Sequence, residues 1–136
     1  MMNILIADDD AAARKMVSHY LKKKNYNVFE ASNGIETFTS IIEHPINIAI
    51  IDWVLPGMDG IEVLTRIREI NEEILVIVIT GYATVETAIE AMKQGAYDFI
   101  SKPFEPDQLI ETLIALLGGK TPEILPDAAT KPEETE

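Results

Sequence analysis

The chain has 136 residues, 47% of them hydrophobic, and a formal net charge of −12. This length and apolar content suffice for one well-buried core and are too small for two, so we expect a single folded domain. The acidic balance argues against a nucleic-acid surface and against anionic membranes, and it favours a cation or a basic protein patch as partner.

Cysteine is absent, which excludes disulfides and thiolate metal sites and fits a reducing compartment. The N-terminal sequence MMNILIADDD becomes acidic after a few apolar residues, unlike a signal peptide. No apolar run approaches the roughly 20 residues that a membrane-spanning helix needs. We therefore expect a soluble, cytoplasmic protein.

Short aliphatic runs rich in β-branched residues predict five strands, several of them covered on both faces. The last of these runs has the weakest pattern. The predicted strands are Asn3–Ala7, Asn27–Ala31, Ile46–Ile51, Leu75–Thr80 and Asp98–Ser101.

Apolar residues recur every three or four positions after each strand, which predicts five amphipathic helices. Asn33-Gly34 and Asp59 are expected to open the second and third helices, and Gly95 and Gly118-Gly119 to end the fourth and fifth. Alternating strands and helices predict an α/β fold, a parallel sheet with helices on both faces. The expected helix faces are Ala13, Met16, Val17 and Tyr20; Ile35, Phe38 and Ile42; Ile61, Leu64 and Ile67; Val85, Ala88, Ile89 and Met92; and Leu109, Leu113, Leu116 and Leu117.

The composition changes near the C-terminus. From Thr121 the sequence TPEILPDAATKPEETE has three prolines, five acids and one lysine. Such a composition is typical of a disordered segment or a linker. We therefore expect residues 1–119 to form the folded domain and residues 120–136 to be an acidic tail or a truncated linker.

Unusual polar residues lie at the carboxyl ends of the predicted strands, where open parallel sheets bind ligands. Asp8–Asp10 end the first strand, Asp52 the third and Thr80 the fourth, and Lys102 follows the fifth. If the first and third strands are neighbours, their ends lie about 5 Å apart. Two like charges about 4 Å apart repel by roughly 4 kcal/mol at an effective dielectric of about 20. The acids therefore need a compensating cation, and oxygen ligands of this kind suit Mg²⁺.

Several of these residues also have a purely structural interpretation. Asp10 could cap the first helix, and a threonine such as Thr80 commonly ends a β-branched strand. A capping role covers at most one of Asp8 and Asp9. Asp52 is harder to explain structurally, because a carboxylate closing a buried strand is costly unless it is paired or liganded.

The stretches ILIADDD, IIDWVLPGMDG, VIVITGYATVETAIEAMKQGAYDF and ISKPF together resemble the receiver domain of bacterial two-component response regulators. The resemblance spans about Asn3 to Gly118 and is strongest to receivers of nitrogen-regulator-type transcription activators. It implies a five-stranded parallel sheet in the flavodoxin-like order 2-1-3-4-5. It also implies a phosphoprotein switch that is not an enzyme with its own substrate turnover.

The resemblance assigns roles to the acids. Asp52 matches the residue that accepts a phosphoryl group from a phosphohistidine on a sensor kinase or phosphotransfer protein, as a carboxylate nucleophile. Asp9 matches a direct Mg²⁺ ligand beside Asp52, Asp8 would hold the ion through water, and the backbone carbonyl of Val54 would also bind it. Mn²⁺ is an expected substitute.

The resemblance also assigns roles to the polar residues on the following strands. Lys102, which would otherwise be taken for a surface lysine, matches the counterion of the phosphoryl oxygens, and Lys102-Pro103 is a candidate cis peptide. Thr80 matches the switch hydroxyl, with Gly81 as a small neighbour that leaves space for its approach. Phe99 matches an aromatic switch position, but it has no hydroxyl.

Phosphorylation adds about −1.5 to −2 charges at one point and biases a two-state element. By resemblance, that element is the face formed by the fourth helix, fifth strand and fifth helix, which would contact an output domain or partner protein. A dimer that forms on phosphorylation is a further expectation.

Three other classes of protein share parts of this pattern. A magnesium-dependent phosphatase of the haloacid-dehalogenase type needs a second aspartate two residues after its nucleophile, where this chain has Val54. A nucleotide-binding domain would need a glycine-rich loop where ADDDAAAR has three negative charges. A receiver-like module acting by partner contact alone would not need the acids together with Thr80 and Lys102.

Overall fold

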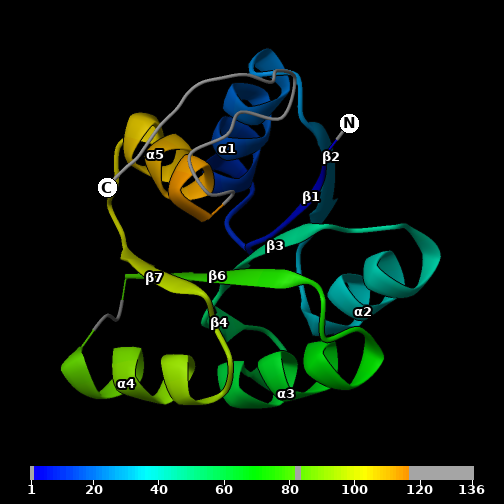
Figure 1. Ribbon diagram of the computed structural model, residues 1–136, viewed down its shortest axis with the longest axis vertical. Coiled ribbons are helices and arrows are strands. Elements are labelled where there is room, and N and C mark those ends of the chain that lie inside the picture. Colours follow the sequence, from blue (N-terminus) through cyan, green and yellow to red (C-terminus); the bar gives the residue numbers. More distant parts are fainter. Residues whose placement is uncertain (1, 82–83, 117–136) are drawn as a thin grey trace.

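Five parallel strands form the middle layer of the structure, with helices on both sides (Figure 1). The computed structural model describes residues 2–81 and 84–116. The strands of this sheet are β1 (Asn3–Ala7), β2 (Asn27–Ala31), β3 (Ile48–Asp52), β6 (Leu75–Thr80) and β7 (Asp98–Ser101). The helices are α1 (Ala11–Lys23), α2 (Gly34–Glu43), α3 (Gly60–Ile70), α4 (Val85–Lys93) and α5 (Pro106–Leu116).

The strand order is β2-β1-β3-β6-β7, which confirms the predicted flavodoxin-like order. Helices α1 and α5 cover one face of the sheet, and α2, α3 and α4 cover the other (Figure 1). Each strand pairs in parallel with its neighbours, and Ala7 on β1 is level with Ile51 on β3. The residues that follow these two therefore meet at one edge of the sheet.

The core consists of two apolar layers on the two faces of the sheet. Successive side chains of β1 alternate between them: Ile4 and Ile6 pack with α1 and α5, whereas Leu5 and Ala7 pack on the side of α2, α3 and α4. A strand that is buried on both faces needs aliphatic side chains at nearly every position, which explains the aliphatic runs in the sequence. No helix within the described ranges is both long and apolar enough to cross a bilayer.

Helix ends follow local side-chain chemistry. The side chain of Asp10 accepts hydrogen bonds from the backbone N–H groups of Ala12 and Ala13, so Asp10 caps α1. Asn33 and Asp59 cap α2 and α3 as predicted, and Gly95 follows α4 at φ +102. The predicted end of the fifth helix at Gly118-Gly119 and the predicted tail 120–136 lie outside the described residues.

The predicted face of α2 is wrong for two of its three residues, because only Phe38 packs against the core. Ile35 and Ile42 are 75% and 70% exposed, and Thr37 and Ile41 are buried instead. Both sets have helical spacing, so the apolar period alone could not choose between them. Thr37 tolerates burial because its hydroxyl donates to the backbone oxygen of Asn33 at 2.8 Å.

The predicted face of α4 is also wrong as a core face. Val85, Ile89 and Met92 are 75%, 50% and 47% exposed, while Ala91 is fully buried. A small residue at the contact brings the helix close to the sheet layer, and the larger apolar residues are left at the surface. The exposed residues of α4 thus form an apolar surface that the rest of the described chain does not cover.

A short hairpin follows the third strand of the sheet and was missed by the sequence prediction. Strands β4 (Val54–Leu55) and β5 (Met58–Asp59) are antiparallel, and Gly57 has φ +86 in the turn between them. The preceding strand was predicted as Ile46–Ile51, but it runs from Ile48 to Asp52. Asp52 is therefore the last residue of a buried strand.

Candidate functional site

Three aspartates meet at the carboxyl edge of β1 and β3. One carboxylate oxygen from each of Asp8, Asp9 and Asp52 lies within 4.8 Å of the other two. Asp8 and Asp52 are buried, with exposed fractions of 1% and 7%, and Asp9 is exposed. The predicted convergence of these acids is present because β1 and β3 are neighbours in register.

Lys102 joins the same cluster from the loop after β7. Its Nζ donates to Oδ2 of Asp8 at 2.7 Å and to Oδ2 of Asp52 at 2.8 Å. The Lys102-Pro103 peptide bond is cis, as expected. The backbone N–H of Lys102 donates to the oxygen of Thr80 at 2.9 Å, so the loop is tied to the end of β6.

Burial and charge act in opposite directions on this cluster. Burial raises the pKa of Asp52, against the hydrogen bonds from Lys102 and from the backbone N–H of Val54, and the charge of Asp8 raises it further. Burial acts to lower the pKa of Lys102, but its hydrogen bonds to the two carboxylates outweigh burial and raise that pKa. Lys102 is therefore a permanent cation at neutral pH.

The hairpin after β3 holds the carboxylate of Asp52. The N–H of Val54 donates to Oδ1 of Asp52 at 3.0 Å, and the side chain of Val54 is 50% exposed. Trp53 points elsewhere, because it packs against the apolar layer on the side of α2, α3 and α4. A sequence that breaks into a Pro-Gly turn directly after Asp52 thus places a backbone donor on its carboxylate.

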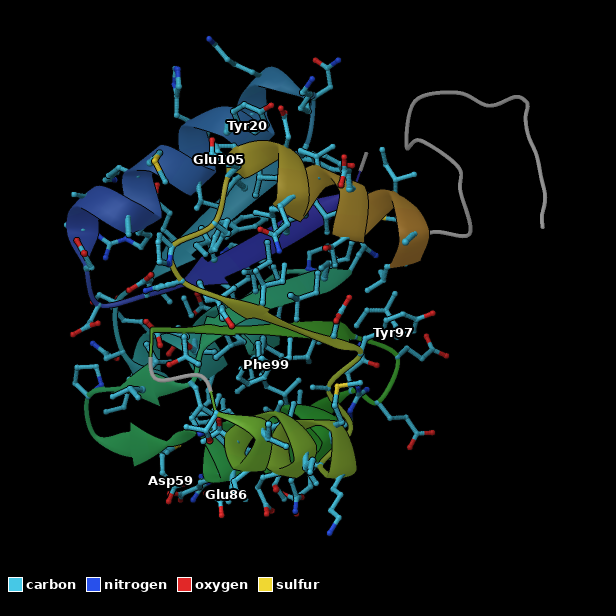
Figure 2. All side chains as sticks on the ribbon, turned by 90° about the vertical axis from the view of Figure 1, so that its left-hand side faces the viewer. Tyr20, Asp59, Glu86, Tyr97, Phe99 and Glu105 are labelled. Atoms are coloured by element: carbon cyan, nitrogen blue, oxygen red, sulfur yellow. The ribbon has the colours of Figure 1, made fainter. Side chains whose placement is uncertain are left out.

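The predicted switch residues occupy different surroundings. Thr80 ends β6 and is fully buried, while Gly81 is exposed and leaves 4.0 Å between an added Cβ and the Cβ of Lys102. Phe99 packs against the apolar layer on the side of α4, as Figure 2 shows. Tyr97, 52% exposed, directly precedes the first residue of β7.

The sequence prediction missed two features around the acids. An open pocket of about 430 Å³ lies between α1 and the loop after β7, with Asp8 and Lys102 in its wall. The guanidinium of Arg14 donates to the backbone oxygen of Asp8 at 2.8 Å. No local sequence pattern indicates the pocket, whose other lining includes Ala13, Met16, Val17, Ile79, Pro103 and Phe104.

The donor set fits a hard divalent cation. Asp8, Asp9 and Asp52 offer only carboxylate oxygens, two of them from buried side chains that already need a cation, which Lys102 supplies in this structure. Oxygen ligands with room for retained waters are what Mg²⁺ prefers. These residues therefore have the chemistry to hold magnesium at the exposed side of the cluster.

The chain belongs to the response regulator receiver domain family, whose model matches residues 4–114. Receiver domains are signalling domains of two-component systems. The fold, the strand order and the aspartates at the strand ends agree with this membership.

Individual relatives extend the comparison. An NtrX-like response regulator from Rickettsia typhi (strain ATCC VR-144 / Wilmington) is 40% identical over 111 residues, which are 80% of this chain and 23% of the relative. Sporulation initiation phosphotransferase F from Bacillus subtilis (strain 168) is 35% identical over 111 residues, which are 80% of this chain and 90% of that protein. The chain thus spans about a quarter of the first relative and most of the second.

The structural comparison agrees. The crystal structure of a CheY-like response regulator receiver domain protein from Methanospirillum hungatei JF-1 matches with a TM-score of 0.83. It is 31% identical in sequence, and the match covers 87% of this chain and 94% of that chain. The similarity therefore extends over nearly the whole receiver domain.

Proposed function

We propose that this chain is a phosphoacceptor switch in which Asp52 receives a phosphoryl group from a histidine of a sensor kinase or phosphotransfer protein. The observation that carries the proposal is the buried carboxylate of Asp52, held beside Asp8 and Lys102 at the strand ends. Membership of the receiver family and similarity to a protein named a phosphotransferase support it.

The transfer needs positioning and charge neutralisation more than covalent activation. A carboxylate oxygen of Asp52 attacks phosphorus in line, a P–O bond forms, and the P–N bond to the donor imidazole breaks with its electron pair left on the imidazole. The N–H of Val54 holds one oxygen of Asp52. This orients the nucleophile before the donor arrives.

Mg²⁺ is the proposed cofactor, and Mn²⁺, which also accepts oxygen ligands, is expected to replace it. Asp9, Asp52 and the backbone carbonyl of Val54 would hold it directly, and Asp8 through water. When bound, the ion neutralises charge on the phosphoryl oxygens. Asp9 is the exposed member of the cluster, which suits a ligand on the side open to solvent.

Lys102 and Thr80 are proposed to respond to the modification. Lys102 leaves the shared carboxylates and pairs with the phosphoryl oxygens, and the hydroxyl of Thr80 moves toward the same group past the small Gly81. Phe99, which packs on the side of α4, changes rotamer with this movement. Lacking a hydroxyl, Phe99 acts through packing alone.

The output face is proposed to be α4, β7 and α5. Its apolar surface includes Val85, Ile89, Met92 and Tyr97, which are between 47% and 75% exposed. Exposed apolar patches of this kind mark protein contacts. An output domain, a partner protein or a second phosphorylated copy would bind there, and the chain has no turnover of a separate substrate.

Intact mass spectrometry tests the proposal. After incubation with a small-molecule phosphodonor and Mg²⁺, the wild-type chain is expected to gain one phosphoryl mass, and Asp52→Asn none. Asp98→Asn, which changes an exposed aspartate on β7, is the matched control and should be modified normally. A gain that persists in Asp52→Asn removes Asp52 from its role.

A second measurement separates the switch from a module that acts without phosphorylation. Titration with Mg²⁺ and then with beryllofluoride, followed by the fluorescence of Trp53 beside Asp52, should give two saturable steps. Absence of both steps in the wild-type chain would favour the phosphorylation-independent module. Release of free phosphate from small phosphate esters with continuous turnover would favour the phosphatase.

A further inference from the structure

Arg14 links helix α1 to strand β2 and to the backbone of Asp8, which is a member of the acidic cluster Asp8, Asp9 and Asp52. From α1, its Nη1 donates to the backbone oxygen of Asp8 at 2.8 Å, and its Nε donates to Oε1 of Glu30 on β2 at 2.9 Å. The side chains of Arg14 and Glu30 are only 14% and 20% exposed. A partly buried guanidinium that uses its planar fork on two acceptors is well ordered.

The bond from Arg14 completes the restraint of the backbone at Asp8. The N–H of Asp8 donates to the oxygen of Ala31 at 3.0 Å, and the carboxylate of Asp8 accepts from the N–H of Asp10 at 3.0 Å. The carbonyl that Arg14 holds belongs to the planar peptide unit between Asp8 and Asp9. Its orientation therefore sets the direction in which Asp9 leaves the strand.

Glu30 holds Arg14 in place from the neighbouring strand. Glu30 is level with Ile6 in the β1–β2 register, two residues before Asp8. Lys15 also contacts Glu30, at 3.2 Å, but its side chain is 68% exposed and this ion pair lies on the surface. Lys15 thus shares the charge and the partner of Arg14 without its contact to Asp8.

We propose that Arg14 is a positioning residue for the magnesium site, which fixes the Asp8–Asp9 peptide so that both carboxylates face the ion. This inference rests on the proposed function, because it assumes that the acids bind Mg²⁺. Neither of the two hydrogen bonds of Arg14 described above is made to a carboxylate of the acidic cluster. Arg14 therefore acts through the backbone of Asp8.

A positioning role and a purely electrostatic role of Arg14 predict opposite changes in Mg²⁺ affinity when Arg14 is removed. A cation near a metal site repels the metal ion, so removal of Arg14 would tighten Mg²⁺ binding if only its charge mattered. If Arg14 holds the peptide in place, its removal weakens binding. A merely structural contribution would lower the unfolding temperature and leave the Mg²⁺ affinity of the folded protein unchanged.

The experiment compares Arg14→Met, Arg14→Lys and the control Lys15→Met in the otherwise complete chain. The Mg²⁺ dissociation constant is measured by Trp53 fluorescence at constant ionic strength, with thermal unfolding in EDTA as a separate measurement of stability. Arg14→Met is expected to raise the Kd about 10-fold or more, the usual effect of losing a residue that orients a metal ligand. Arg14→Lys, which keeps the charge but lacks the fork, should raise it by a smaller factor, and Lys15→Met should leave it within about twofold.

An unchanged or lower Kd in Arg14→Met overturns the inference, as does an equal increase in Lys15→Met. Should Arg14→Met fail to fold, the Mg²⁺ Kd of Arg14→Lys is compared with that of Lys15→Met. A Kd for Arg14→Lys that is no higher than that of Lys15→Met then overturns the inference. A wild-type chain without a saturable Mg²⁺ response overturns the magnesium part of the proposed function, and the inference with it. Failure of the proposed function can thus be told apart from failure of the inference about Arg14, because it is seen in the wild-type chain before any variant is compared.

Discussion

Lys102 Nζ lies 2.8 Å from Oδ2 of Asp52, and the same ammonium group also bonds to Asp8. Removal of one partner of a buried ion pair leaves uncompensated charge. In EDTA, Lys102→Met is therefore expected to lower the free energy of unfolding by about 3 kcal/mol. Mg²⁺ should restore part of this loss, because a cation again neutralises the acids.

Urea unfolding with and without Mg²⁺ measures both effects. Lys93→Met, at an exposed position on α4, is the control and should change the free energy of unfolding by less than about 0.5 kcal/mol. Equal losses in the two variants would show that the contact of Lys102 with the acids contributes little.

Magnesium is expected to stabilise the folded chain. At a free Mg²⁺ concentration about 100 times the Kd, binding to the folded state alone adds about 2.7 kcal/mol to the free energy of unfolding. Calorimetry should show this as a higher unfolding temperature that EDTA reverses. Asp9→Asn should lose most of the gain, whereas Asp98→Asn should keep it; an equal gain in both would place the ion elsewhere.

The Arg14–Glu30 pair predicts a pH dependence of stability. Burial acts to raise the pKa of Glu30, but hydrogen bonds from Arg14 and Lys15 outweigh it, and the net pKa is lowered. A lowered folded-state pKa stabilises the protein above the unfolded value of about 4.3, and this stabilisation is lost as the pH falls through the folded value. The stability difference between wild type and Glu30→Gln should therefore be largest at neutral pH and shrink below about pH 4.

Chemical unfolding at a series of pH values provides the measurement. Glu62→Gln is the control, because Glu62 pairs with Arg66 on the surface, where the side chains are 46% and 54% exposed. Its effect should stay within about 1 kcal/mol at every pH. A difference for Glu30→Gln that grows as the pH falls would contradict the prediction.

Gly60 is expected to be intolerant of a side chain. A Cβ at this position would overlap the ring of Trp53 and lie 2.8 Å from the backbone oxygen of Trp53. Gly60→Ala should therefore cost about 1–3 kcal/mol through forced displacement of the indole, and shift Trp53 fluorescence. Gly81→Ala, with its nearest contact at 4.0 Å, should leave both folding stability and fluorescence close to wild type.

The apolar surface of α4 makes a further stability prediction. Ile89→Ser should change the free energy of unfolding by less than about 0.5 kcal/mol, because the side chain is half exposed. Ala91→Leu on the buried side should cost about 1–3 kcal/mol through overpacking. Denaturant titration of both variants checks this, and a large loss in Ile89→Ser would mean that the side chain is part of the core.

The central strands could be predicted because nearly every residue in them carries the same signal, an aliphatic side chain. The β1 and β6 sequences are aliphatic at nearly every position, as burial on two faces requires, and their predicted bounds match the structure. Asp52 was predictable as a site residue because a carboxylate ending such a strand conflicts with burial. The strand order itself came from family resemblance and was not available from local pattern.

The remaining errors have a common physical origin in tertiary contacts. On α2, the set Thr37 and Ile41 and the set Ile35 and Ile42 both fit a helical period, and only packing on the sheet selects the first. The contact of Arg14 with Asp8 could not be predicted, because an arginine in the first turn of a helix has no sequence signal for such a contact. The pocket beside Lys102 depends on the approach of two distant segments.

The order of the sheet leaves β2 and β7 as its outer strands. β7 has four residues and begins with the exposed Asp98, and β2 carries Glu30 with its bound arginine. Short or charged outer strands are poor templates for the addition of further chains. The outer strands are therefore poor sites for edge-to-edge association of copies, even though apolar side chains of α4 are exposed elsewhere on the domain.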